Sequence, residues 1–304
     1  MITRRDLLKG LVASSAMLVH PFGAFAAAPV SIKRPIPSSG EPLPVIGMGS
    51  SGTFNVGSSE RVRTRLREVL QLFFEGGGTL IDTSPMYGTA ESVLGEVLTG
   101  LPGRKQLFAA TKVWTDGREA GIAQMRRSMV RMRVARFDLI QIHNLRDWRT
   151  HLPTLRQWKA DGFVRYVGIT TSHGRSHSEL VRILETEPFD FVQFSYSLAT
   201  RAAARRSLPL ARERGIAVLV NRAFQRGAMF HAVRGRPLPS WAAGIDCTSW
   251  AQVFLKFVVS HPAVTCTIPA TSKPKHMRDN MRANFGRLPD AALRRRMVKF
   301  WDSL

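Results

Sequence analysis

The sequence of 304 residues contains few cysteines and no long apolar run. Its two cysteines, Cys247 and Cys266, exclude a disulfide-rich scaffold and any zinc module held by four cysteines. They leave open whether the two thiols pair or are buried separately. No apolar run reaches the roughly 18 residues of a membrane-spanning helix. The histidines show no metal-ligand spacing, so His151, His173 and His177 are interpreted as surface or loop residues and no metal is expected.

Acidic residues are also scarce, with 22 Asp and Glu against 44 Lys and Arg and a formal net charge of +22. Arginine supplies 35 of the 44 basic residues. An excess of arginine can bind nucleic acid or an anionic membrane surface. Here the basic residues are spread over nearly every stretch, without a basic tail or interleaved aromatic residues for base stacking. This pattern favours an ordinary solvated surface, and no nucleic-acid partner is expected.

Residues 1–26 have the pattern of an export signal. A basic start is followed by an apolar stretch over residues 10–19, and the Ala-Phe-Ala triplet at 24–26 fits a cleavage site. Residues 3–9, Thr-Arg-Arg-Asp-Leu-Leu-Lys, resemble the twin-arginine signal, which exports folded proteins that usually carry a cofactor. The sequence therefore predicts a periplasmic protein with no membrane span after signal removal. A cytoplasmic location is the alternative if the signal is not used.

After a proline-rich linker or entry arm over residues 27–44, short apolar runs alternate with amphipathic segments. The predicted strands are residues 45–49, 79–82, 107–112, 137–143, 164–170, 189–194, 216–220 and 264–268. From the second strand to the seventh, their last residues recur at intervals of 24 to 31 residues, the size of one βα unit. Eight such units make a (β/α)8 TIM barrel of the α/β class over residues 45–304, with its chemistry at the carboxyl ends of the strands. An insertion at 227–246 either covers the mouth of the site or is a surface loop.

An open Rossmann sheet is the alternative fold, because residues 47–52 read Gly-Met-Gly-Ser-Ser-Gly. That fingerprint requires a helix to begin directly at the glycines, where its amino end meets the pyrophosphate. Residues 53–57 intervene here, and the next helix is predicted to begin near Ser58. The regular βα alternation favours the barrel.

Three chemically active side chains each end a predicted strand. Asp82, Lys112 and His143 end the second, third and fourth strands, and Tyr87 follows in the loop after Asp82. A barrel would place them side by side. Tyrosine is a weak acid with a pKa of about 10, and a neighbouring ammonium lowers that pKa. With Asp82 keeping Lys112 charged and His143 orienting a substrate oxygen, the set could protonate a carbonyl oxygen while hydride reaches the carbon.

At these residues the sequence resembles the aldo/keto reductase superfamily. The likeness spans about residues 45–285 and rests on residues 80–88 (Leu-Ile-Asp-Thr-Ser-Pro-Met-Tyr-Gly), 111–113, 138–143 (Asp-Leu-Ile-Gln-Ile-His), 167–170, 191–196 and 268–272. The resemblance implies a barrel that binds NADPH across its strand ends and reduces aldehydes or ketones. It implies Tyr87 as general acid, Asp82 and Lys112 as the groups that tune it, and His143 as the group that orients the carbonyl.

The resemblance also implies cofactor contacts. Gln193 and Thr170 correspond to groups that bind the nicotinamide carboxamide, and Thr171 stands where many members have Asn. Val220 stands where many relatives have a Tyr stacked on the nicotinamide. The further candidate cofactor residues are Gly49, Asp82, Asn221, Arg222, Pro269, Thr271, Ser272, Lys273, His276 and Asn280. The family's usual Lys, Ser and Arg at the 2′-phosphate are replaced by Ala270, Thr271 and His276, but nearby Arg278 and Arg282 favour NADPH over NADH.

Phe54, Trp114 and Asn144 are candidates for contact with a small carbonyl substrate, although Phe54 and Trp114 could instead belong to the core and Asn144 to a loop. The predicted function is therefore NADPH-dependent reduction of aldehydes or ketones to alcohols. A non-catalytic NADP-binding sensor or partner-binding barrel is the alternative, because the stacking Tyr is missing and the export signal leads away from the cytoplasmic NADPH pool.

Overall fold

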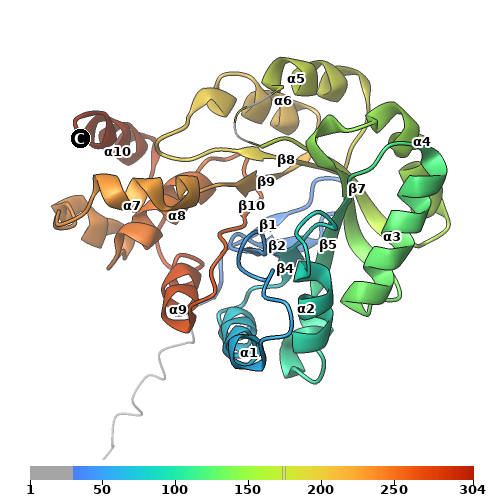
Figure 1. Cartoon of the computed structure of the whole chain (residues 1–304). Helices are drawn as coiled ribbons and strands as arrows, with labels where there is room; N and C mark the ends of the chain where they lie inside the picture. Colours follow the sequence, from blue (N-terminus) through green and yellow to red (C-terminus); the bar gives the residue numbers. More distant parts are fainter. Residues whose placement is uncertain (1–29, 173, 175) are drawn as a thin grey trace, which may run out of the picture.

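The computed structural model describes residues 30–172, 174 and 176–304, and it has the predicted barrel (Figure 1). Its parallel strands are β3 (Met48–Gly49), β4 (Leu80–Asp82), β5 (Phe108–Val113), β6 (Phe137–Ile142), β7 (Val164–Thr170), β8 (Phe191–Ser195), β9 (Ala217–Asn221) and β10 (Cys266–Thr267). Each strand pairs with the next one in the chain. Parallel bridges from Ile46 to Thr267 and from Gly49 to Ala270 join the two ends of the sheet. The sheet therefore closes, which confirms the (β/α)8 barrel and rules out the open Rossmann sheet.

Helices lie around the outside of the barrel (Figure 1). They are α1 (Glu60–Glu75), α2 (Ala90–Val97), α3 (Arg118–Met132), α4 (Trp148–Ala160), α5 (His177–Thr186), α6 (Ser207–Glu213), α7 (Ala228–Ala232), α8 (Trp250–Val259), α9 (Pro274–Arg282) and α10 (Ala291–Asp302). The predicted insertion at 227–246 contains α7 and the 3₁₀ helix η5 (Ser240–Ile245). Apolar side chains fill the space between strands and helices and form a second cluster inside the barrel. Both clusters bury apolar surface, the main favourable contribution to folding.

The proline-rich segment before the barrel is a hairpin rather than a plain linker. β1 (Lys33–Pro35) pairs antiparallel with β2 (Pro42–Pro44). Ile36 and Leu43 of this hairpin are buried in the inner apolar cluster together with Tyr166, near the start of β7. The hairpin therefore closes the amino end of the barrel and leaves the carboxyl ends of the strands open for chemistry.

The structure corrects one interpretation and answers one open question. His151, expected at the surface or in a loop, is fully buried in α4, where its Nε2 donates to the carbonyl oxygen of Thr115 at 2.8 Å. Cys247 and Cys266 are both buried and unpaired. Over the described ranges, no helix is long and apolar enough to cross a membrane, and no group of three or more His, Cys, Asp or Glu could hold a metal ion.

Candidate active site

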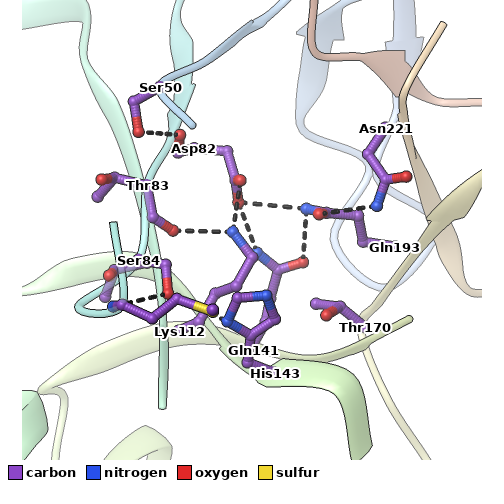
Figure 2. Close-up of polar contacts among 12 residues, drawn as sticks. Ser50, Asp82, Thr83, Ser84, Lys112, Gln141, His143, Thr170, Gln193 and Asn221 are labelled. Atoms are coloured by element: carbon purple, nitrogen blue, oxygen red, sulfur yellow. Dashed lines mark hydrogen bonds and ion pairs between the residues drawn. The ribbon is translucent and has the colours of Figure 1, made fainter. Parts of the chain in front are cut away.

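The barrel brings Asp82 and Lys112 together at the carboxyl ends of β4 and β5 (Figure 2). Lys112 Nζ donates to Asp82 Oδ2 at 2.5 Å and to the carbonyl oxygen of Thr83 at 2.8 Å. Lys112 is fully buried and Asp82 is 2% exposed. Burial acts to lower the pKa of Lys112, but the interactions of its ammonium with Asp82 and Tyr87 together more than offset this effect, and the pKa lies above its ordinary value. The ammonium is therefore charged at physiological pH.

Tyr87 lies over this ion pair, in the loop between β4 and α2. Lys112 Nζ lies 5.2 Å from the centroid of its ring, and the ring meets the His143 imidazole edge to face at 5.9 Å. Burial raises the pKa of Tyr87 above 10, while Lys112 and Arg226 act to lower it. Lys112 thus lowers the pKa of Tyr87, as the sequence predicted, but this effect is smaller than the rise caused by burial. Tyr87 remains a neutral phenol that can give its proton to an alkoxide formed beside it.

His143 begins the 3₁₀ helix η2 (His143–Leu145) directly after β6. Burial and the nearby Lys112 charge lower its pKa to about 2, so the imidazole is neutral. Its Nδ1 lies 3.1 Å from Ser84 Oγ, which in turn accepts from the backbone N–H of Met86 at 3.4 Å. The serine hydroxyl hydrogen is then available for Nδ1, which leaves the imidazole hydrogen on Nε2. Nε2–H is the donor that a carbonyl oxygen requires.

The second oxygen of Asp82 is held by two amides that come from other strands (Figure 2). Asp82 Oδ1 accepts from Gln141 Nε2 at 2.8 Å and from Gln193 Nε2 at 3.2 Å. Gln193 Nε2 also lies 3.2 Å from Gln141 Oε1. Gln141 was not among the predicted site residues. The signal was its position two residues before His143, because alternate residues of a strand face the same side.

The predicted carboxamide-binding residues lie next to one another at the ends of β7, β8 and β9. Asn221 Nδ2 donates to the carbonyl oxygen of Thr171 at 3.1 Å and to Gln193 Oε1 at 3.3 Å. Thr170 Oγ1 accepts from the backbone N–H of Asn144 at 3.2 Å. Thr171 Oγ1 is buried and has no hydrogen-bond partner within the described part of the chain. Buried hydroxyls are normally paired, so this group fits a ligand amide such as the nicotinamide carboxamide.

The structure corrects the residue assigned to the position of the stacking tyrosine. Val220 is fully buried and packs outward into the layer between strands and helices. Asn221 is the residue of β9 whose side chain faces the mouth, and its Oδ1 accepts from Ser195 Oγ at 2.6 Å. Because side chains alternate along a strand, a shift of one residue exchanges an outward position for an inward one.

The loop after β9 carries two arginines without a carboxylate partner among the ion pairs of the described residues. Arg222 is half-buried with a positive φ of 57°, and its buried Nε has no hydrogen-bond partner among the residues that the structure describes. Burial and the charge of Arg226 lower the pKa of Arg222. Two cations this close favour an anion between or beside them, which agrees with the predicted contact of Arg222 with the cofactor.

The remaining predicted cofactor residues lie where β10 leads into α9. The backbone N–H of Gly49 donates to the carbonyl oxygen of Pro269 at 3.2 Å, so these two are in contact. Thr271 Oγ1 accepts from the backbone N–H of Lys273 at 3.1 Å, just before α9 begins. Ser272 lies between them, His276 is exposed in the first turn of α9, and Asn280 is buried near its end. A helix amino end with Lys273 beside it is suited to a phosphate.

Two of the three predicted substrate residues lie at the mouth, and one does not. Phe54 is fully buried in the outer apolar cluster, so its prediction as a pocket residue is wrong. Trp114 is half-buried, and the Arg146 guanidinium lies 4.7 Å from its ring centroid. Asn144 is exposed next to His143 with a φ of 55°, and its Oδ1 accepts from Ser172 Oγ at 3.2 Å.

Comparison with known proteins agrees with this geometry. The family model described as the aldo/keto reductase family matches residues 45–296, which include every member of the Asp82, Tyr87, Lys112 and His143 set. The chain belongs to the aldo/keto reductase family. This aldo/keto reductase is therefore an oxidoreductase by family, and its reactive side chains occupy the end of the barrel where barrel enzymes carry out their chemistry.

Relatives and solved structures give the same result for this aldo/keto reductase. It is 28% identical over 245 residues to the methylglyoxal reductase YeaE of Escherichia coli, a match that covers 78% of this chain and 84% of the relative. It is 27% identical over 198 residues to the NADH-specific methylglyoxal reductase of Escherichia coli, covering 55% of this chain and 58% of that protein. An aldo-keto reductase from Klebsiella pneumoniae, solved in complex with NADPH, superposes with a TM-score of 0.74 at 21% identity over 89% of this chain and 95% of its own. The last likeness supports the fold.

Proposed function

We propose that the protein is an NADPH-dependent reductase of small aldehydes and ketones. The observation that carries this proposal is the buried Lys112–Asp82 ion pair beneath Tyr87, beside a neutral His143. NADPH, when bound, supplies the hydride to the carbonyl carbon. His143 Nε2–H holds the carbonyl oxygen, and Tyr87 gives that oxygen its proton. Lys112 then stabilises the phenolate that remains.

The cofactor fits two groups of residues. The unpartnered Thr171 hydroxyl, with Thr170 and the Gln193 amide, would hold the nicotinamide carboxamide at the strand ends. The loops around Arg222 and the amino end of α9 would hold the phosphates. We propose NADPH rather than NADH because Lys273 and His276 place positive charge and a hydrogen-bonding group at α9. The two methylglyoxal reductase relatives make a small dicarbonyl the first substrate to test.

The test is a titration of the purified protein with NADPH and with NADH, followed by turnover on a panel of small carbonyls that includes methylglyoxal. Bound dihydronicotinamide should quench the fluorescence of Trp114, which lies at the mouth of the barrel. A Trp114→Phe variant, assayed beside the wild type, identifies the quenched residue. Saturable NADPH binding with consumption of NADPH by at least one carbonyl supports the proposal. Binding without turnover on any carbonyl would favour the sensor function instead.

We also propose that the protein is exported through a twin-arginine signal. The signal, residues 1–26, lies outside the described residues, so this proposal rests on the sequence alone. Fractionation of cells that express the full chain, with mass analysis of the amino terminus, should find a periplasmic protein that begins near Ala27. The double variant Arg4→Lys, Arg5→Lys should stay in the cytoplasm. Equal distribution of both proteins between the fractions would refute the proposal.

A further inference from the structure

The carboxyl ends of the barrel strands contribute a connected set of polar side chains (Figure 2), next to the apolar cluster in the barrel interior. Consecutive strands contribute Asp82, Lys112 and Gln141, and β8 contributes Gln193. Gln141 is fully buried and makes contact on both sides: its Nε2 donates to Asp82 Oδ1 at 2.8 Å, and its Oε1 accepts from Gln193 Nε2 at 3.2 Å. The Gln141 amide thus connects the ion pair beneath Tyr87, through Asp82, to the predicted cofactor-binding residue Gln193.

The intervening strand β7 leaves room for this contact. Gly168 pairs with Gln141 in the sheet register, between β6 and β8. A Cβ atom at Gly168 would lie 2.9 Å from Gln141 Cγ and 3.0 Å from the carbonyl oxygen of Phe191. The absence of a side chain at Gly168 therefore allows the Gln141 amide to reach Gln193 two strands away.

The hydrogen-bonding groups of Gln193 show why its contact with Gln141 matters for cofactor binding. Its Nε2 has two hydrogens, and the structure places Asp82 Oδ1 and Gln141 Oε1 as their acceptors. Its Oε1 accepts from Asn221. Its Oε1 keeps a second lone pair, which can accept from the amide N–H of a carboxamide. Because Gln141 Oε1 holds one hydrogen of the same Gln193 amide, Gln141 fixes the direction in which Gln193 Oε1 faces.

We infer that Gln141 is a positioning residue that couples nicotinamide binding at Gln193 to the proton donor Tyr87. Gln141 fixes the carboxylate of Asp82, Asp82 fixes the ammonium of Lys112, and Lys112 faces the ring of Tyr87. Cofactor binding and proton transfer therefore depend on the same amide. The inference deepens the proposed function and rests on it.

Two variants separate positioning from packing. Gln141→Met keeps an unbranched side chain of similar length but removes both the donor and the acceptor. Gln141→Glu keeps an acceptor for Gln193, and donates to Asp82 when it is protonated. Gln71→Met is the matched control, because Gln71 is exposed on α1 and bonds to Glu75. Thermal unfolding of each variant at each pH reports the folded fraction, to which all rates are normalised.

For Gln141→Met, we expect kcat to fall by about tenfold or more and the Kd for NADPH to rise several-fold, because each half of the site loses a buried hydrogen bond. The Kd is measured by fluorescence and needs no turnover. For Gln141→Glu, the ratio of its kcat to that of the wild type should rise as pH falls from 8 toward 5. The titratable groups next to position 141 are Asp82, which bonds to Gln141, Lys112, its partner in the sheet register, and His143, two residues further along the chain. Burial beside the Asp82 charge raises the pKa of a carboxyl placed there.

A residue that merely fills space gives a different result. Gln141→Met would then match Gln71→Met in both kcat and Kd, and the Gln141→Glu ratio would not change with pH; either result overturns the inference. A fall in kcat alone, with NADPH affinity unchanged, also overturns the coupling. If the wild type binds NADPH and reduces a carbonyl, and the Gln141 variants do so equally well, the inference is refuted and the proposed function stands. Wild-type protein that neither binds NADPH nor reduces a carbonyl refutes the proposed function and the inference with it.

Discussion

Replacing Lys112 with methionine should destabilise the protein and weaken its proton donor, Tyr87, at the same time. The side chains of Lys112 and Asp82 are 0% and 3% exposed, and their charged atoms are 2.5 Å apart. Lys112→Met leaves the Asp82 carboxylate buried with two amide donors and no counter-charge. Breaking one partner of a buried ion pair costs about 3–5 kcal/mol of unfolding free energy. Urea unfolding of the two proteins measures this loss.

The same change should lower kcat by more than the folded fraction explains. Burial continues to raise the pKa of Tyr87, whereas the lowering by Lys112 is gone. Since general acid catalysis contributes about 10²- to 10⁴-fold to a rate, kcat should fall by roughly that factor. The double variant Lys112→Met, Asp82→Asn separates the two effects. It removes both charges, so it should regain most of the lost stability and none of the lost rate.

Two results would contradict this reasoning. A Lys112→Met protein as stable as the wild type would mean that water or another cation neutralises Asp82. A double variant that regains activity along with stability would mean that Lys112 acts through folding rather than through Tyr87.

Three further outcomes follow from the described contacts. The pKa of His143 is lowered from 6.5 to about 2, so on acidification the unfolded chain takes up a proton at this residue before the folded chain does. The unfolding free energy should therefore fall by up to about 1.4 kcal/mol per pH unit below pH 6.5 because of His143. A His143→Gln variant whose unfolding free energy depends on pH in the same way over this range would contradict this. Burial and the charges of Lys273 and Lys275 lower the pKa of His276. A bound 2′-phosphate would favour the protonated ring, so the affinity for NADPH should rise from pH 8 to pH 6 while that for NADH stays constant, and parallel changes would refute this cofactor preference. Both cysteines are buried, and burial raises the pKa of Cys247 to about 11, so a maleimide should label neither thiol until the protein unfolds.

The barrel and the main reactive residues were predictable because each depends on local sequence. Apolar runs at intervals of one βα unit predict parallel strands, and in a barrel the residues that end those strands must meet at one face. Asp82, Lys112 and His143 lie together for that reason. Strand ends differ from prediction by up to three residues, as with β3, which was predicted over residues 45–49 and is Met48–Gly49 in the structure.

The remaining features depend on contacts between distant segments. The hairpin before the barrel is held by Ile36 and Leu43 in the barrel interior, which a count of prolines does not reveal. Phe54 is fully buried in the outer apolar cluster rather than in a pocket, and the residue type alone does not distinguish the two. The pKa of Tyr87 depends on desolvation, which has no signature in sequence. Gln141 bonds to residues 59 and 52 positions away, so its role appears once the strands are side by side.

The most direct test of the account is a single turnover of NADPH by wild-type protein and by Tyr87→Phe. Each protein is first saturated with NADPH, as measured by fluorescence, and then mixed with a carbonyl that the wild type reduces. The account predicts nearly equal affinities for NADPH and a rate of NADPH oxidation lower by about 10²-fold or more in the variant. Equal rates in the two proteins would contradict the assignment of Tyr87 as the proton donor.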